Sequence, residues 1–175
     1  TTKMKTMIGD LLAFNSFAVD AVPVKIETVQ INDVISDIVR RWGATHSQTD
    51  LYISYLEEDT NLQTDVIRVQ QILTNLLTNA EQAMDGNGTI HVTLQKNEHS
   101  IIVDVQDSGC GIPLAEQPFI FERFYRGEQK KYKIRGLGLG LPLSKMMAQS
   151  IGGELTLLKS TSRGTTFRLK LMKTF

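Results

Sequence analysis

The chain has 175 residues, of which 41% are hydrophobic and 22% are charged, and its formal net charge at pH 7 is zero. That length suits one globular domain with a real core, and the neutral charge gives no reason to expect a nucleic acid or an anionic membrane as a partner. The single cysteine, Cys110, excludes an internal disulfide framework and suits a reducing compartment, and no zinc-ligand spacing joins it to the three histidines.

The N-terminal part of the chain predicts a helix, a break and then mixed structure. Apolar residues at helical spacing favour an amphipathic helix from residue 3 to about 18, and Pro23 marks a break. A strand near 24–31, a helix near 33–46 and a strand at 51–55 are expected next. No apolar run approaches the roughly 18 residues of a membrane span and no signal peptide opens the chain, so we expect a soluble piece of a larger protein.

The central and C-terminal parts alternate helices with hairpins. Thr64 or Asp65 can cap a long helix over 65–84, which ends at the turn Asp85-Gly86-Asn87-Gly88. The later elements are expected in this order: strands at 89–95 and 100–107, an irregular stretch at 108–137, a helix from about Pro142 to Gly152-Gly153, and strands at 153–159 and 164–171. This order predicts an α+β fold in which helices cover one face of a mixed sheet.

Residues 136–140 place a glycine at every second position directly before the last predicted helix. A Walker loop is excluded because Gly140 is followed by Leu141 and Pro142, and a dinucleotide fingerprint lacks its third glycine and its preceding strand. Glycines still allow a close backbone approach, and a helix N-terminus attracts anions. The segment 122–135 carries six basic and two acidic residues, so it is either a lid over phosphates or a solvated loop.

Two polar residues are expected to point to the same face of their strands as the buried apolar side chains. Asp107 continues the inward alternation of the strand at 100–107, and Thr165 shares the inward parity of the strand at 164–171. A buried carboxylate needs a donor, and the neighbouring glycines would let a flat polar ligand such as adenine approach. The alternative is an Asp-Gly turn whose carboxylate accepts hydrogen bonds from its own loop.

Four polar side chains lie on one stripe of the long predicted helix, at the margin of its apolar face: Arg68, Asn75, Asn79 and Gln82. Asparagine is a poor helix former, so two asparagines one turn apart call for an explanation. Amide carbonyl oxygens are suitable ligands for Mg²⁺, which usually keeps water and substrate phosphates as its other ligands. Exposed polar filler is the alternative.

Five stretches, in one order, resemble the catalytic ATP-binding domain of two-component sensor histidine kinases, within the gyrase, chaperone and MutL ATPase superfamily. They are similar to the N box (NLLTNA), first glycine box (DSGCGI), F box (FERFYRG), second glycine box (GLGLGL) and third glycine box (GTTF). The resemblance covers roughly residues 24–172 and implies the Bergerat fold, a two-layer α/β sandwich whose mixed, mostly antiparallel sheet is covered on one face by helices. Residues 1–19 resemble the tail of a dimerisation and phosphoacceptor helix, which leaves 20–175 as the ATP-binding domain.

The resemblance also implies roles for single residues. Asn79 would coordinate Mg²⁺, and Asn75 would contact phosphate or help to orient the attacking group in catalysis. Asp107 would accept a hydrogen bond from the adenine amino group, with Thr165 supporting it through water. The implied nucleotide contacts are Asn75, Asn79, Gln82, Asp107, Gly109, Gly111, Ile112, Arg126, Lys130, Gly136, Leu137, Gly138, Leu139, Gly140 and Thr165.

The F box and the end of the N box carry two further details. Phe121 and Phe124 are expected to pack at the base of the lid. Where many relatives carry lysine and an aromatic residue after the N box, this chain has Gln82 and Ala83. A positive phosphate contact at that point is therefore not expected.

The implied function is that of a protein histidine kinase, which binds Mg-ATP and transfers the γ-phosphoryl group to a histidine in two-component signalling. Phosphoryl transfer depends on positioning and charge neutralisation, which suits asparagine, Mg²⁺ and basic residues. The family's acceptor histidine precedes an acidic residue, whereas His46, His91 and His99 precede serine or valine. We therefore expect the acceptor upstream of Thr1.

Two other functions stay open, an ATP-hydrolysing clamp and an anti-sigma-type nucleotide-binding module. Clamp ATPases carry a glutamate four residues before the magnesium asparagine, where this chain has Asn75, which cannot act as a base. The partners implied by the resemblance are the protein's own dimerisation and phosphoacceptor domain and a response regulator, with no nucleic acid. A homodimeric parent and a cytoplasmic location for this domain are also implied, while membrane attachment of the parent and a monomeric state of this chain stay open.

Overall fold

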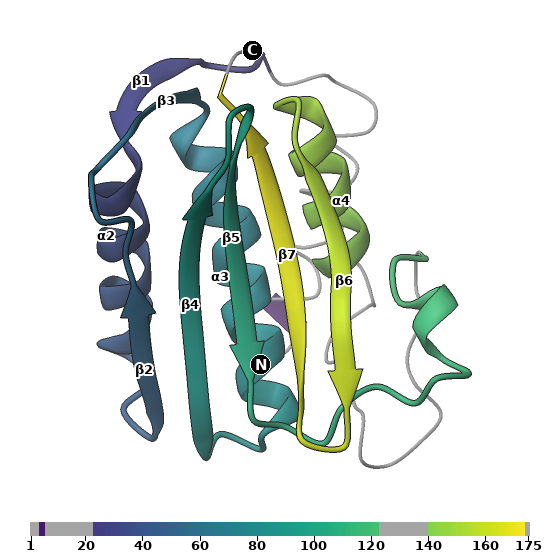
Figure 1. Cartoon of the computed structure of the whole chain (residues 1–175). Coiled ribbons are helices and arrows are strands. Elements are labelled where there is room, and N and C mark those ends of the chain that lie inside the picture. Colours follow the sequence, from purple (N-terminus) through teal and green to yellow (C-terminus); the bar gives the residue numbers. More distant parts are fainter. Residues whose placement is uncertain (1–3, 6–22, 123–139, 174–175) are drawn as a thin grey trace.

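The computed structural model describes residues 4–5, 23–122 and 140–173. Its main sheet has the strand order β2-β4-β5-β7-β6 (Figure 1). The five strands are β2 (Thr49–Ser54), β4 (Gly88–Lys96), β5 (Ser100–Asp107), β6 (Glu154–Thr161) and β7 (Gly164–Met172). β2 pairs with β4 in parallel and all other neighbours are antiparallel, so the predicted mixed, mostly antiparallel sheet is confirmed.

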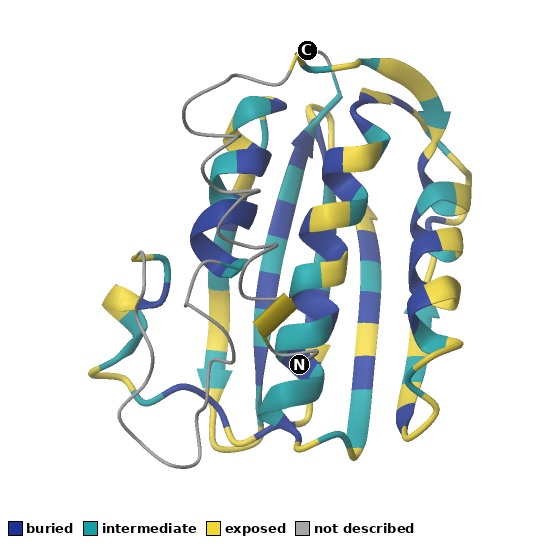
Figure 2. Cartoon of the chain, turned by 180° about the vertical axis from the view of Figure 1, so that it is seen from behind, coloured by how far each residue is buried: buried dark blue, intermediate teal, exposed yellow. Residues whose placement is uncertain are grey.

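Three helices cover one face of this sheet, namely α2 (Ile31–Gly43), α3 (Val66–Ala83) and α4 (Gly140–Ser150). Figure 2 shows α3 in the middle of the helical layer, with α2 and α4 on either side of it. The inward side chains of the sheet and the helices form one apolar core. The largest fully buried side chains are Ile31, Ile35, Leu62, Ile72, Leu73, Leu76, Leu77, Ile90, Ile101, Ile120 and Leu155. The predicted two-layer α+β architecture is therefore confirmed.

Helix α3 begins and ends where its sequence predicts. Asp65 is the N-cap, and its Oδ1 accepts a hydrogen bond from the backbone N–H of Arg68 at 3.2 Å. Past the other end of the helix, Asp85 and Gly86 take positive φ angles of 51° and 85° and turn the chain into β4. This capped, central helix is the element that carries the N box.

The region before α3 differs from the prediction. The strand expected near 24–31 is shorter, β1 (Glu27–Gln30), and α2 begins at once at Ile31. β1 pairs antiparallel with β3 (Asn61–Thr64), a strand that was not predicted, in a separate two-stranded sheet. β3 has four residues with one apolar side chain, Leu62, so its sequence carries almost no strand signal.

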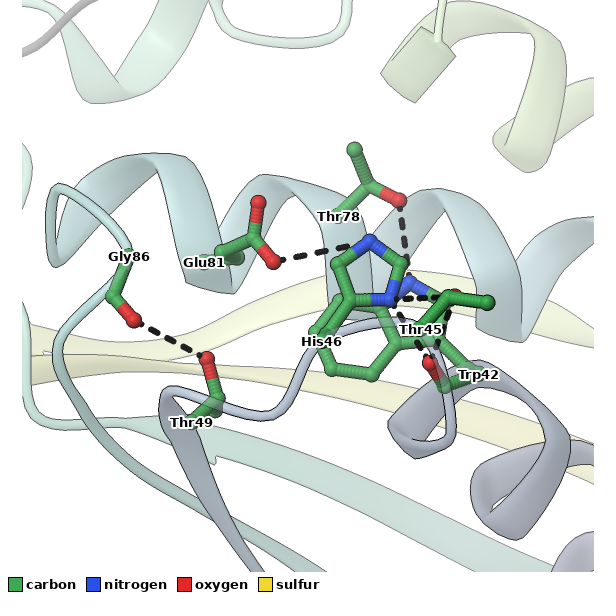
Figure 3. Close-up of polar contacts among 7 residues, drawn as sticks. All are labelled: Trp42, Thr45, His46, Thr49, Thr78, Glu81 and Gly86. Carbon is green, nitrogen blue, oxygen red and sulfur yellow. Dashed lines mark hydrogen bonds and ion pairs between the residues drawn. The ribbon is translucent and has the colours of Figure 1, made fainter.

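Polar and aromatic contacts join α2 to the C-terminal half of α3 (Figure 3). The buried Trp42 donates its indole N–H to Thr78 Oγ1 at 3.3 Å. His46 stacks on the Trp42 ring with centroids 3.8 Å apart, and its Nε2 lies 3.5 Å from Glu81 Oε2. These contacts fix the helix that carries the N box from the side opposite α4.

The helix predicted over 3–18 lies almost wholly outside the described residues, as does the proposed boundary at residue 19, so both stay predictions. Within the described part of the chain, no helix combines the length and the apolar character that a membrane span requires. A one-turn 3₁₀ helix, η1 (Gln117–Phe119), precedes the F box.

Candidate functional site

Asp107, the last residue of β5, is a buried carboxylate at the edge of the helical layer. Its residue surface is 5% exposed, as its inward parity predicted. One oxygen, Oδ1, accepts hydrogen bonds from the backbone N–H of Gly109 at 2.8 Å and from that of Thr165 at 3.2 Å. Because Oδ1 takes both donors, Oδ2 is the oxygen left to accept a hydrogen bond from a ligand.

The environment of Asp107 changes its acidity. Desolvation by burial raises the pKa of the carboxyl from 3.8 to about 6, although the backbone N–H groups of Gly109 and Thr165 act in the opposite direction. The group is thus held as a desolvated anion at neutral pH. Such an anion has a strong tendency to accept a hydrogen bond from any donor that enters the site.

Thr165 faces inward on β7, as predicted. Its hydroxyl forms a hydrogen bond with Ser160, a residue that the sequence did not single out. Thr165 is 3% exposed, and its Oγ1 lies 2.8 Å from Ser160 Oγ. Ser160 Oγ also accepts a hydrogen bond from the backbone N–H of Ile112 at 2.7 Å. Ser160 therefore links the first glycine box to Thr165, and this role comes from its position across the β6–β7 hairpin rather than from any sequence pattern.

The first glycine box packs against the end of α3 and against β6. The backbone N–H of Cys110 approaches the carbonyl of Ala83, at the end of α3, at 3.4 Å, and a Cβ on Gly109 would overlap the same carbonyl. Gly111 has a φ of +79°, and a Cβ there would overlap the Thr161 carbonyl. The end of α3, the DSGCGI loop and the β6–β7 hairpin consequently meet at one point.

The asparagines of the N box face different partners. Asn75 donates its side-chain amide to the Gly140 carbonyl at 3.4 Å and to Ser144 Oγ at 3.0 Å, which ties α3 to the start of α4. Asn79 and Gln82 follow on the same helix as half-buried side chains. Arg68, predicted on this stripe, is instead buried and contacts Asp65 and Ser150, so it belongs to the packing of α3 rather than to the site.

The F box joins the same assembly through Phe121. Its ring meets the ring of Phe167 on β7 edge to face, with centroids 6.2 Å apart. The ammonium group of Lys145 on α4 lies 4.5 Å from the centroid of the Phe121 ring. Phe121 thus connects the start of the F box to β7, which carries the third glycine box, while its expected place at the base of the lid stays a prediction.

Several predicted residues lie outside the described part of the chain: Phe124, Arg126, Lys130, Gly136, Leu137, Gly138 and Leu139. Their implied roles stay predictions. Among the described residues, the predicted nucleotide contacts fall into two groups, called here the Asp107 end and the Asn75 end. The Asp107 end includes Gly109, Gly111, Ile112 and Thr165, and the Asn75 end includes Gly140.

The donor set at each end fits a different part of a magnesium nucleotide. A desolvated carboxylate beside close-packed glycines suits the exocyclic amine of a flat base. Amide oxygens from α3 suit Mg²⁺, which takes its remaining ligands from water and phosphate. No group of three or more His, Cys, Asp or Glu side chains that could hold a metal occurs within residues 4–5, 23–122 and 140–173.

Comparisons with known proteins agree with this geometry. The model of the family described as "Histidine kinase-, DNA gyrase B-, and HSP90-like ATPase" matches residues 64–174. The chain is 30% identical over 175 residues to sensor histidine kinase WalK of Bacillus subtilis (strain 168), covering 98% of this chain and 29% of that protein. It therefore spans less than a third of that curated relative's length.

Two solved structures place the fold in the same group. The structure of the mycobacterial sensor histidine kinase MprB has a TM-score of 0.70 at 25% identity, covering 85% of this chain and 97% of that one. The structure of histidine kinase ThkA in complex with response regulator protein TrrA has a TM-score of 0.80 at 22% identity, covering 99% of this chain and 48% of that one. The second likeness supports the fold alone.

Proposed function

Because this chain belongs to the histidine kinase-, DNA gyrase B- and HSP90-like ATPase family, we propose that it binds Mg-ATP and transfers the γ-phosphoryl group to a histidine. The acceptor would lie on the dimerisation and phosphoacceptor domain of the parent kinase. The parent would then pass the phosphoryl group to a response regulator in two-component signalling. The observation that carries this proposal is the buried, desolvated carboxylate of Asp107, at the point where the first glycine box meets the end of α3 and the β6–β7 hairpin.

Asp107 supports the choice of adenine as the base. The adenine amino group is a donor that can meet Oδ2, whereas guanine presents a carbonyl oxygen at the corresponding position, so that two acceptors would face each other. A hydrogen bond to a charged group contributes roughly 1.5–3 kcal/mol, which corresponds to a ten- to hundredfold preference. Thr165, held by Ser160, would bind the same edge of the base through a water molecule.

The phosphate end would be formed by α3 and the start of α4. Bound Mg²⁺ would neutralise charge on the phosphates and hold them in a reactive arrangement. Asn75 and Asn79 are the side chains that would hold the metal and its water. Gly140, at the N-terminus of α4, lies directly beside Asn75 and would offer its backbone to the outer phosphates.

Phosphoryl transfer is favoured over ATP hydrolysis by the position of Asn75. An ATPase of the clamp type requires a carboxylate base there, and an amide that donates to Gly140 and Ser144 cannot take a proton from water. Sensor histidine kinase WalK, which is similar to almost the whole chain, is also named for the kinase activity. The parent is further proposed to be a homodimer with this domain in the cytoplasm.

The deciding experiment mixes the chain, Mg-ATP labelled at the γ-phosphate, and the dimerisation domain of the parent protein. We expect acid-labile phosphohistidine on the dimerisation domain. Release of phosphate without transfer would indicate a clamp ATPase, and nucleotide binding with neither activity would indicate a binding module.

A further inference from the structure

We infer that Ser144 is a positioning residue, which, with the Gly140 carbonyl, turns the Asn75 amide so that its oxygen faces the magnesium nucleotide. The inference rests on the proposed function, since it concerns the same site. It adds a residue outside the five motif stretches and assigns one atom of Asn75 to the metal rather than to phosphate.

The contact is built between two packed helices. Asn75 is half-buried on α3, and Ser144 is completely buried on α4, one turn after Gly140. The Asn75 amide nitrogen lies 3.0 Å from Ser144 Oγ and 3.4 Å from the Gly140 carbonyl oxygen. At 0% exposure, the Ser144 hydroxyl has no access to bulk water as a substitute partner.

The chemistry of the partners decides which way the amide points. A backbone carbonyl oxygen can only accept a hydrogen bond, so the Asn75 atom that faces Gly140 must be the nitrogen and not the oxygen. Each amide hydrogen then has one acceptor, the Gly140 carbonyl and Ser144 Oγ. The oxygen Oδ1 points away from α4 and is the atom of Asn75 that can meet a ligand.

This orientation changes the role expected for Asn75. An amide nitrogen could donate to a phosphate oxygen, but here that nitrogen is already committed to α4. The oxygen suits Mg²⁺ or one of its water ligands. Asn79 lies one helical turn further on, and residues four apart on a helix are neighbours at about 5–6 Å between Cβ atoms, so both amide oxygens can serve one hydrated ion.

The alternative is that Ser144 merely holds two helices together. The fold offers a matched control for this, because a second serine of α4 makes a similar link to α3 at the other end of the pair. Arg68 donates from Nη1 to Ser150 Oγ at 2.7 Å. Ser150 thus ties the same two helices together, but it lies on a different stretch of both helices from Asn75 and Gly140.

The test compares Ser144→Ala with Ser150→Ala. ATP affinity is measured by calorimetry with Mg²⁺ and again with EDTA, and stability by urea unfolding. We expect Ser144→Ala to weaken Mg-ATP about fivefold, the equivalent of one hydrogen bond, while metal-free ATP and adenosine change less than twofold. Ser150→Ala should lower stability to a similar degree and leave the effect of Mg²⁺ on affinity as in the wild type.

Two results would overturn the inference: equal weakening of Mg-ATP and metal-free ATP by Ser144→Ala, or no change in either. If the wild type itself bound no ATP, the proposed function would fail instead. A measurement on the wild type covers the case in which Ser144→Ala does not fold. Hydrogen exchange of the Asn75 side-chain NH₂, followed by NMR, should stay slow in the Mg-ATP complex, and rapid exchange there would contradict the assigned orientation.

Discussion

Asp107 divides its carboxylate between two tasks. Oδ1 accepts the backbone N–H groups of Gly109 and Thr165, which fastens the loop and the last strand to β5. In the proposed function, Oδ2 would then be the acceptor for a base. The two interpretations of the DSG sequence, a self-bonded turn and a ligand carboxylate, are therefore compatible, because a carboxylate has two oxygens and each interpretation uses one.

The first prediction concerns the pH dependence of adenosine binding, since adenosine carries no phosphate that titrates near neutrality. Burial raises the pKa of Asp107 to about 6, and only the ionised carboxylate offers Oδ2 as a full acceptor. Affinity should be constant above about pH 7 and should fall by up to tenfold per pH unit below about pH 6. Titration by NMR between pH 5 and 8 checks this, with Asp107→Asn as a pH-independent control. A flat wild-type profile would contradict the assignment.

The second prediction concerns how far the buried, ionised carboxylate of Asp107 lowers the free energy of unfolding. Because the folded pKa is raised above 3.8, the stability linked to this group is fully present below pH 3.8 and is lost as the pH rises through about 6. The full difference is worth roughly 3 kcal/mol. Asp107→Asn keeps an oxygen for Gly109 and Thr165 and removes the charge.

We therefore expect Asp107→Asn to be more stable than the wild type at pH 7.5, by roughly 1–3 kcal/mol, and to lose this advantage near pH 4. Urea unfolding at both pH values measures it. ATP affinity should fall at the same time, because the new NH₂ group meets the adenine amine as donor against donor. If Asp107→Asn were less stable than the wild type at pH 7.5, the charge of Asp107 would not destabilise the folded protein.

At the scale of elements, the site depends on how closely loops approach helices and strands. Gly111 illustrates this, because a positive φ and the Thr161 carbonyl both exclude a side chain there. Gly86 has a similar φ of +85°, but a Cβ there would meet nothing within 4 Å. Substitutions at Gly86 and Gly111 therefore separate the destabilisation caused by backbone conformation from the destabilisation caused by steric overlap.

The third prediction uses this pair. Gly86→Ala should lower the free energy of unfolding by about 1–2 kcal/mol, because alanine disfavours the left-handed backbone conformation, and should leave ATP affinity unchanged. Gly111→Ala should lower the free energy of unfolding by about 1–3 kcal/mol more than Gly86→Ala does, because its side chain is also overpacked against Thr161. It should also weaken ATP binding at least tenfold, because the first glycine box is displaced. Urea unfolding and calorimetry on both variants check it. Equal stabilities would mean that the loop can move away from β6 at little cost.

The fourth prediction concerns the link between α2 and α3 in Figure 3. Thr78→Val keeps the shape of the side chain but leaves the buried Trp42 N–H without its acceptor. The free energy of unfolding should fall by about 1–3 kcal/mol. This fall is measured as a shift of the urea transition, followed by tryptophan fluorescence. ATP affinity should not change, since this contact faces α2 rather than α4. A large loss of affinity would mean that α3 shifts as a unit when this contact is lost.

Sequence patterns were sufficient for the elements with strong local signals. The cap at Asp65 and the inward parity of Asp107 and Thr165 were predictable because each follows from spacing along one segment. β3 could not be predicted, because four residues with one apolar side chain acquire their conformation from pairing with β1. Ser144 and Ser160 were missed for the same reason, since their roles depend on partners far away in the chain.

At the scale of the whole molecule, the structure shows where the chain's own three histidines lie. His91 is exposed, stacks on Tyr52 at 4.9 Å, and lies on the sheet face opposite the helices. His99 precedes β5, roughly 25 Å along the strand from Asp107. His46 has partners at both ring nitrogens, the Trp42 carbonyl and Glu81.

The fifth prediction follows from these positions. Incubated alone with Mg-ATP labelled at the γ-phosphate, the chain should gain no phosphohistidine, and addition of the parent's dimerisation domain should produce label on that domain. Mass spectrometry of both samples checks this, with Asp107→Asn as the nucleotide-binding control. Stable label at any of the three histidines of this chain would mean that the acceptor has been misplaced.

The strand order β2-β4-β5-β7-β6 has a consequence for biosynthesis. Asp107 leaves the ribosome 58 residues before Thr165, which at ordinary translation rates is roughly 3–12 s earlier. During that interval β5 has an unpaired edge, and β6 has no neighbour in the sheet, because β7 is the strand that joins them. A nascent chain therefore cannot complete its adenine end until β7 is synthesised, and translation products that stop before Thr165 should bind chaperones instead of ATP.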